Sequence, residues 1–137
     1  MSYEIRKGWP SNAALDEPIS AVDGTELVDG TVAILDAATG KWKTGAVTSA
    51  SGKGPLHAFI IAKEDLRYTY VGLMSDAIIE VDADHYTGTT FKAGDPLSAD
   101  ENGKFVAAGS NAVIGKVINF DPVSKHMRLV WKPIASN

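Results

Sequence analysis

Three histidines are the side chains of this sequence best suited to exchange protons near neutral pH: His57, His85 and His126. They do not lie at metal-ligand spacing from one another, and the sequence contains no HxH or HExxH pattern. His57 begins an apolar run, which favours a packed or edge histidine. His85 follows Asp82 and Asp84, and these three side chains could hold a divalent cation. Hard cations prefer several carboxylates in one loop with a later bidentate Glu, which is missing here, so a solvated turn is the favoured interpretation.

Serine nucleophiles and phosphate-binding loops are the other chemistry that the sequence could carry. The Ala/Gly/Ser-rich segments around Ser49, Ser51 and Ser110 lack a GxSxG elbow. Residues 52–55 (GKGP) resemble a phosphate cradle, but without the GxxxxGK[ST] spacing we expect only a loop tip. The acidic residues of 65–84 alternate with apolar ones, as on the solvent face of strands, and do not resemble a glycosidase pair. The sequence therefore predicts no catalytic residue, no cofactor and no metal site.

Composition narrows the class of protein further. The chain has 137 residues and no cysteine, and 17 acidic against 13 basic residues give a formal net charge of -4. A disulfide framework, thiolate zinc sites and cysteine nucleophiles are thereby excluded. The mild acidity and the lack of any Lys/Arg run argue against nucleic-acid binding. No signal-peptide-like start and no run near the ~20 apolar residues of a membrane helix occur, so we expect no membrane partner and synthesis in the host cytoplasm.

Short apolar runs separated by turn signals predict an all-β fold. Turn dipeptides such as Asp29-Gly30 and Asn102-Gly103 are spread along the whole chain. Many short strands at this spacing indicate a small barrel or a β-tulip-like sandwich with little or no helix, and residues 64–67 are the best candidate for a helical turn. The strands expected are 31–35, 41–47, 57–62, 68–73, 77–81, 112–120 and 127–132.

An internal repeat is the most informative feature of the predicted domain, which spans residues 21–137. Two related hairpin units cover residues 28–62 and 92–118. In each unit a Gly opens a strand, an Asp ends it, a Gly-Lys turn follows, and an aromatic residue begins the return strand. Coincidence of turn chemistry is the alternative to a structural repeat. The corresponding residues are Gly30, Asp36, Gly40 and Trp42 in the first unit, and Gly94, Asp100, Gly103 and Phe105 in the second.

The first 20 residues differ from the rest and predict an extended N-terminal arm over residues 1–20. They lack alternation, yet they contain Tyr3, Ile5 and Trp9, whose side chains are costly to leave in water. Pro10 breaks any helix and favours an extended residue before it. An extended arm of this kind binds by adding to the edge of another sheet, which makes these four residues the predicted partner-binding site. A disordered tail and an edge strand packed on its own domain are the alternatives.

The second hairpin carries a resemblance to a known family. Residues 91–105 (FKAGDPLSADENGKF), closing with 112–117 (AVIGKV), resemble the head decoration, or capsid cement, proteins of tailed bacteriophages, in which a GDxL…GKF…IGxV run recurs. The resemblance implies a small β-barrel or β-tulip bound outside the capsid lattice. It also implies oligomers, often trimers, and an N-terminal arm that adds to a sheet of the capsid protein.

We therefore expect a structural, non-enzymatic virion protein on the capsid exterior that binds the major capsid protein. A homo-oligomer is expected, with a trimer favoured and a dimer possible. One alternative is another virion module, such as a tail, head-fibre or carbohydrate-binding domain, for which Trp42 and Trp131 are the candidates outside the arm, although both are more easily interpreted as core. The other alternative is a small enzyme with His85 or His126 as the base.

Overall fold

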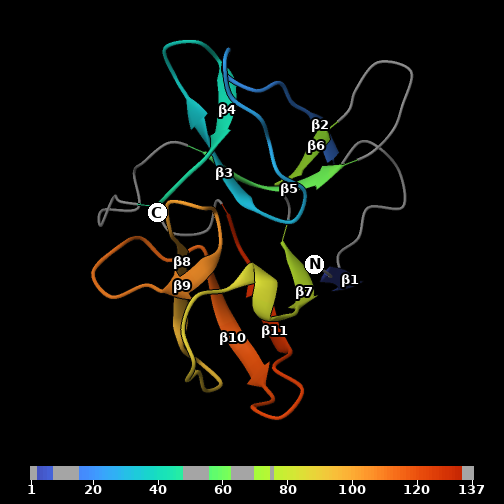
Figure 1. The fold of residues 1–137 in the computed structure, drawn as a ribbon, viewed down its shortest axis with the longest axis vertical. Helices are drawn as coiled ribbons and strands as arrows, with labels where there is room; N and C mark the ends of the chain where they lie inside the picture. The colour runs from blue at the N-terminus through green and yellow to red at the C-terminus, as the bar shows by residue number, and fades with distance from the viewer. Residues whose placement is uncertain (1–2, 8–15, 48–55, 63–69, 75, 134–137) are drawn as a thin grey trace.

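Two antiparallel sheets make up the computed structural model, which describes residues 3–7, 16–47, 56–62, 70–74 and 76–133 (Figure 1). The arrangement is sandwich-like and not closed into a barrel, so the predicted all-β class is confirmed and the barrel form is not observed. The strands in chain order are β1 (Tyr3–Lys7), β2 (Asp16–Pro18), β3 (Val32–Asp36), β4 (Lys41–Thr44), β5 (His57–Ala62), β6 (Tyr70–Leu73), β7 (Ala77–Val81), β8 (Pro96–Ala99), β9 (Phe105–Ala107), β10 (Gly115–Phe120) and β11 (Met127–Trp131).

The two sheets repeat one order of strands. The five-stranded sheet has the order β2-β6-β5-β3-β4, and the six-stranded sheet has the order β1-β7-β11-β10-β8-β9. With β1 set aside, both follow the same sequence of first, fifth, fourth, second and third strand. We name β2–β6 unit 1 and β7–β11 unit 2. Figure 1 shows unit 1 in the upper half and unit 2 in the lower half, with β1 beside β7.

Corresponding backbone hydrogen bonds recur in both units. The amide of Gly30 donates to the carbonyl of Ile60 at 2.8 Å, and the amide of Gly94 donates to the carbonyl of Val117 at 2.7 Å. Both glycines have positive φ, 78° and 93°, a conformation that costs glycine little and other residues much more. Each glycine therefore begins its hairpin at the same place relative to the fourth strand of its unit, β5 or β10.

An isolated parallel bridge also occurs once in each unit. Ala21 pairs with Trp42 in unit 1, and Tyr86 pairs with Phe105 in unit 2. Trp42 and Phe105 are the aromatic residues that begin the return strands of the two hairpins. The correspondence therefore reaches beyond the hairpins to the segment that follows the first strand of each unit.

The turns of both hairpins use the chemistry that the sequence predicts. Asp36 and Asp100 each accept a hydrogen bond at Oδ1 from the backbone amide two residues further on, at 3.2 and 2.9 Å. Gly40 and Gly103 close the turns with φ of 70° and 74°. Local turn chemistry thus determines where each hairpin reverses.

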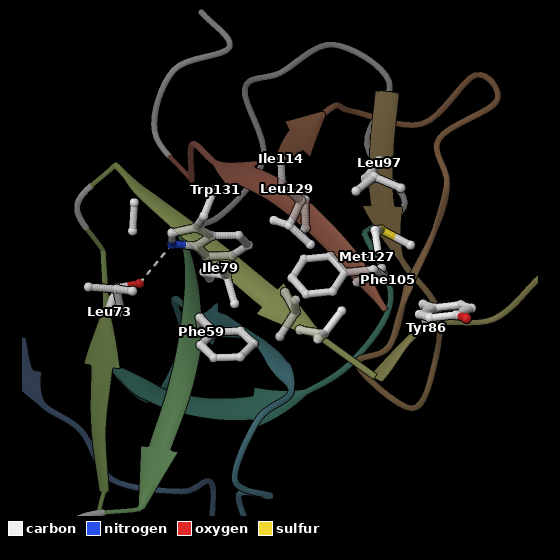
Figure 2. Packing of buried hydrophobic residues seen from close by; sticks show 14 of the residues in the cluster. Phe59, Leu73, Ile79, Tyr86, Leu97, Phe105, Ile114, Met127, Leu129 and Trp131 are labelled. Carbon is white, nitrogen blue, oxygen red and sulfur yellow. Dashed lines mark hydrogen bonds between the residues drawn. The ribbon is translucent and has the colours of Figure 1, made fainter. Parts of the chain in front are cut away.

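The main hydrophobic core lies between the two units. Phe59 on β5 stacks on Phe105 at a centroid distance of 6.0 Å and lies 6.1 Å from the ring of Trp131. The indole Nε1 of Trp131 donates to the carbonyl of Leu73 at 3.1 Å, as Figure 2 shows. These aromatic side chains bury large apolar areas and join strands of both sheets into one core.

The same face of the repeated sheet is buried in unit 1 and exposed in unit 2. Val32 and Phe59 are opposite each other in unit 1 and fully buried. The corresponding pair in unit 2 is Pro96 and Lys116, and both are exposed. Unit 2 covers this face of unit 1, whereas the corresponding face of unit 2 is exposed to solvent. The position that corresponds to Phe59 can therefore hold a charged residue, Lys116.

The described parts of the predicted N-terminal arm pair with strands of the domain. Residues 3–7 form β1, an edge strand antiparallel to β7, and residues 16–18 form β2, which pairs with β6. The sequence had favoured an arm on a partner, and the structure gives β1 the alternative position of an edge strand. Trp9 and Pro10 lie outside the described residues.

Helix is nearly absent from the described residues. The 3-10 helix η2 (Ala83–His85) follows β7, where the sequence predicts a turn. The predicted helical turn at 64–67 lies outside the described residues. In the described ranges no helix is long and apolar enough to cross a membrane.

Candidate functional site

The side chain of Tyr3 fills a socket at the seam between the two units. Its hydroxyl donates to Asp29 Oδ1 at 2.8 Å, and the same oxygen accepts the amide of Ala62 at 2.9 Å. Its ring meets Phe59 edge-on at 5.1 Å and His85 edge-on at 5.8 Å. Burial, and then the hydrogen bond to Asp29, raise the pKa of Tyr3 above its usual value. Tyr3 therefore acts as a neutral donor that holds β1 against both units.

His85 forms the unit 2 side of this socket. Its Nδ1 lies 2.8 Å from the carbonyl oxygen of Gly30. A carbonyl only accepts, so Nδ1 donates this hydrogen bond and Nε2 is the remaining ring nitrogen. That Nε2 is buried without a hydrogen-bond partner among the described residues, and Asp82 Oδ1 is 3.9 Å away. His85 is 2% exposed, which places it in the interior and contradicts the solvated turn that we expected.

The short helix explains why His85 turns inward. Asp82 caps η2 by accepting the amide of Asp84 at Oδ1, at 3.0 Å. The helical turn then directs His85 towards the carbonyl of Gly30 while Asp84 stays exposed. Among the described residues, no group of three or more His, Asp or Glu side chains is placed to hold a metal ion. The arrangement holds two segments together, and its buried imidazole has no access for a substrate.

A small hollow of about 120 Å³ lies beside Tyr3. Glu80, which lines the hollow, accepts a hydrogen bond at Oε1 from Arg128 Nη2 at 3.0 Å, and its Oε2 is 3.9 Å from His126 Nδ1. The half-exposed His126 therefore lies beside the Arg128–Glu80 ion pair, and such exposed pairs contribute little to stability. The lining residues are Tyr3, Glu4, Glu80, Val81, Asp82 and His126.

A second hollow of about 270 Å³ lies at the end of unit 2. Tyr86 and Phe120 line it, and their rings meet edge-on at 5.7 Å. The hydroxyl of Tyr86 donates to the carbonyl of Lys125, whose φ of 62° is unusual for a residue other than glycine. The aromatic rings mainly pack on one another, so this hollow shows an apolar floor and no pair of reactive groups.

The tryptophans considered for sugar binding belong to the core. Trp42 is 5% exposed and Trp131 is fully buried. A sugar ring stacks on an exposed aromatic face, which neither residue offers. His57 is also buried, and desolvation lowers its pKa below the usual value.

The structure separates the four predicted partner-binding residues. Tyr3 points into the socket, and the backbone of Ile5 lies opposite Ile79 of β7. Trp9 and Pro10 lie outside the described residues, as do Ser49, Ser51 and residues 52–55. Ser110 lies in an exposed turn.

Sequence reasoning missed Asp29, Gly30 and His85 as parts of one site. The Asp29-Gly30 dipeptide indicated a turn, and His85 was grouped with the neighbouring acidic residues. A separation of 55 residues lies between Gly30 and His85, so no local pattern could connect them.

Comparison with known proteins adds no relative. A scan against protein-family models, a search of curated proteins and a search of solved structures each found no match.

Proposed function

We propose that this protein is a structural virion component that binds the outer surface of a tailed-bacteriophage capsid and stabilises it. The resemblance of residues 91–117 to decoration proteins is one support. Glycine and aspartate of that motif have structural roles in the second hairpin, where Gly94 begins the hairpin and Asp100 holds the turn. A scaffold of this kind leaves binding to its edges and to its N-terminal segment.

The observation that carries the proposal is the position of β1 at the end of the six-stranded sheet. Within the described part of the chain, no strand pairs with the outer edge of β1. The amides and carbonyls of an open edge accept a strand from another protein. A strand of the major capsid protein adds to this edge in the proposed complex.

The two units give the scaffold the rigidity that a cement protein requires. Val32 of unit 1 donates its amide to the carbonyl of Gly103 of unit 2 at 2.8 Å, and Val47 donates to Ala99 at 3.0 Å. Together with the shared aromatic core, these bonds hold the units in one body. Many copies on a symmetric lattice then multiply a modest affinity per contact through avidity.

Tyr3 has a different part in the proposed complex from the one that the sequence suggested. Its side chain holds β1 in place and is not free to anchor a partner. Trp9 and Pro10 remain the proposed contacts on the capsid surface, since buried aromatics dominate interface energies.

A co-sedimentation experiment with undecorated particles of the encoding phage tests the proposal. Trp9→Ala is expected to lower particle affinity at least 10-fold, about 1.4 kcal/mol, while the unfolding temperature stays unchanged. Val123→Ala is the matched control, because Val123 is a 90% exposed hydrophobic residue on the β10–β11 connection. Its binding is expected to equal that of the parent. Failure of the parent protein to bind particles, or equal binding by Trp9→Ala, would contradict the proposal.

A further inference from the structure

The Asn102–Gly103 dipeptide in the turn of the second hairpin can undergo spontaneous covalent chemistry. Asn102 is the only asparagine of the sequence that glycine follows. Glycine leaves its own amide nitrogen unshielded and its backbone free to rotate, so this nitrogen can attack the side-chain carbonyl carbon of the preceding asparagine. The new C–N bond closes a succinimide, and the side-chain nitrogen leaves as ammonia with the hydrogen of the Gly103 amide. Water then opens the ring to aspartate or isoaspartate.

The folded turn keeps the attacking nitrogen in a hydrogen bond. The amide of Gly103 donates to the carbonyl of Asp100 at 2.9 Å. Oδ1 of Asp100 also accepts the amides of Asn102 and Lys104, at 2.9 and 3.1 Å. Attack requires the Gly103 nitrogen to give up its hydrogen, and a hydrogen bond made by that hydrogen favours the intact amide. The closed turn therefore disfavours the reaction.

Unit 1 holds Gly103 from the other side. Gly103 is buried, whereas Asn102 is exposed. A Cβ on Gly103 would lie 2.6 Å from Thr44 Cγ2 and 2.7 Å from the carbonyl oxygen of Val32, and the Gly103 carbonyl accepts the amide of Val32 at 2.8 Å. Ring closure changes the backbone torsions beside the Gly103 nitrogen, because the succinimide joins the side chain of Asn102 to the main chain. Gly103 can make this change only after the second hairpin separates from unit 1.

We infer that Asn102–Gly103 is a deamidation site that the contact between the second hairpin and unit 1 keeps unreactive, and that reaction in the opened state makes the opening permanent. Isoaspartate adds one backbone atom between Asp100 and Lys104, whose amide and carbonyl close the turn at 2.9 Å. The lengthened turn loses the spacing that this bond and the Val32–Gly103 bond require. The inference concerns the folded domain alone and does not depend on the proposed function.

Peptide mapping of the full chain at mildly alkaline pH tests the inference, with the conversion of Asn102 followed by mass spectrometry. The parent is expected to react at least about 10-fold more slowly in native buffer than in denaturing urea, because the rate follows the population of opened molecules. Below the unfolding transition the rate should rise steadily with urea, since opening exposes buried surface. Equal rates in native buffer and denaturing urea overturn the inference, as does a native rate that does not respond to urea.

Gly30→Ala weakens the contact between the units without changing the second hairpin, because its Cβ would lie 2.9 Å from His85 Nδ1. It is expected to raise the native rate at least about 10-fold and to leave the rate in denaturing urea unchanged. Gly40→Ala is the matched control and should raise the native rate less, since its Cβ meets no described atom within 4 Å. A parent-like native rate in folded Gly30→Ala overturns the inference. If Gly30→Ala does not fold, the urea series on the parent decides.

The permanent opening is tested with a variant that separates the added charge from the added backbone atom. Asn102→Asp carries the charge on a normal backbone at an exposed position, so it is expected to unfold at the temperature of the parent. Aged protein, in which isoaspartate is identified by enzymatic isoaspartyl methylation, is expected to unfold at a lower temperature than Asn102→Asp. Equal unfolding temperatures for the isoaspartate form and Asn102→Asp would show that the longer backbone still closes on unit 1, and would overturn this part of the inference.

Discussion

Tyr3 donates its phenolic hydrogen bond to Oδ1 of Asp29 over 2.8 Å, and this contact joins the first strand of the chain to the turn that opens the first hairpin. Asp29 belongs to unit 1, whereas β1 lies on the sheet of unit 2. The pair therefore ties the N-terminus to both halves of the molecule. Together with the β1–β7 pairing, this contact holds the proposed binding edge in position.

Tyr3→Phe is expected to lower the free energy of unfolding by about 1 kcal/mol, because it removes one hydrogen bond and keeps the ring in its socket. At pH 7 this corresponds to a fall in unfolding temperature of about 4 °C. Because the pKa of Tyr3 is raised in the folded state, its contribution is complete below the unfolded value of about 10 and is lost as pH rises above it. Urea unfolding at pH 8 and pH 11 should therefore show a smaller loss for Tyr3→Phe than for the parent. An equal loss in both proteins would refute this role of the hydroxyl.

Gly30→Ala is expected to destabilise the protein by about 2–4 kcal/mol, because a Cβ there overlaps the imidazole of a buried residue. The added atom would lie 2.9 Å from His85 Nδ1 and 3.0 Å from Tyr3 Cδ1, at a φ of 78°. Gly40→Ala is the matched control, since its φ is 70° and the added atom meets no described heavy atom within 4 Å. Denaturant unfolding should give the control only the strain cost of about 1 kcal/mol. Similar losses in both variants would show that the seam tolerates the extra carbon.

Gly103→Ala tests the contact between the second hairpin and unit 1. A Cβ at this position would lie 2.6 Å from Thr44 Cγ2 and 2.7 Å from the carbonyl oxygen of Val32. The turn would have to move away from unit 1, at an expected cost of about 2–4 kcal/mol. Gly94→Ala has a comparable φ of 93° and meets no described atom within 4 Å, so the expected cost is about 1 kcal/mol. Thermal unfolding that ranks Gly94→Ala as the more damaging change would contradict the packing.

His57→Gln tests the buried histidine of β5 through its pH dependence. Burial lowers the pKa of His57, so the folded state favours the neutral ring. Its contribution is present above the unfolded pKa of about 6.5 and is lost as pH falls towards the lower folded value. The free energy of unfolding should therefore fall less between pH 7.5 and pH 5 in His57→Gln than in the parent. An equal fall in His57→Gln and in the parent would contradict this role of the buried imidazole.

The sequence by itself determined the local geometry of this protein. Asp36, Gly40, Asp100 and Gly103 act within a few residues of their own positions, because a turn depends on backbone φ and on the nearest amides. The short apolar runs and the spacing of the turn residues between them likewise predicted most of the strands. The turn residues shared by the two hairpins indicated the repeat.

Only the tertiary structure decided how these pieces meet. The contact between Gly30 and His85 joins residues far apart in the chain. The paired strands β1 and β7 are also far apart in sequence and are not joined by a turn that a local pattern could predict. The exposure of Lys116 beside the burial of Phe59 follows from which unit covers which face. Such relationships are set by the packing of surfaces that are far apart in the sequence. Tyr3, which the sequence predicts as a partner contact, holds the N-terminal strand in place in the structure.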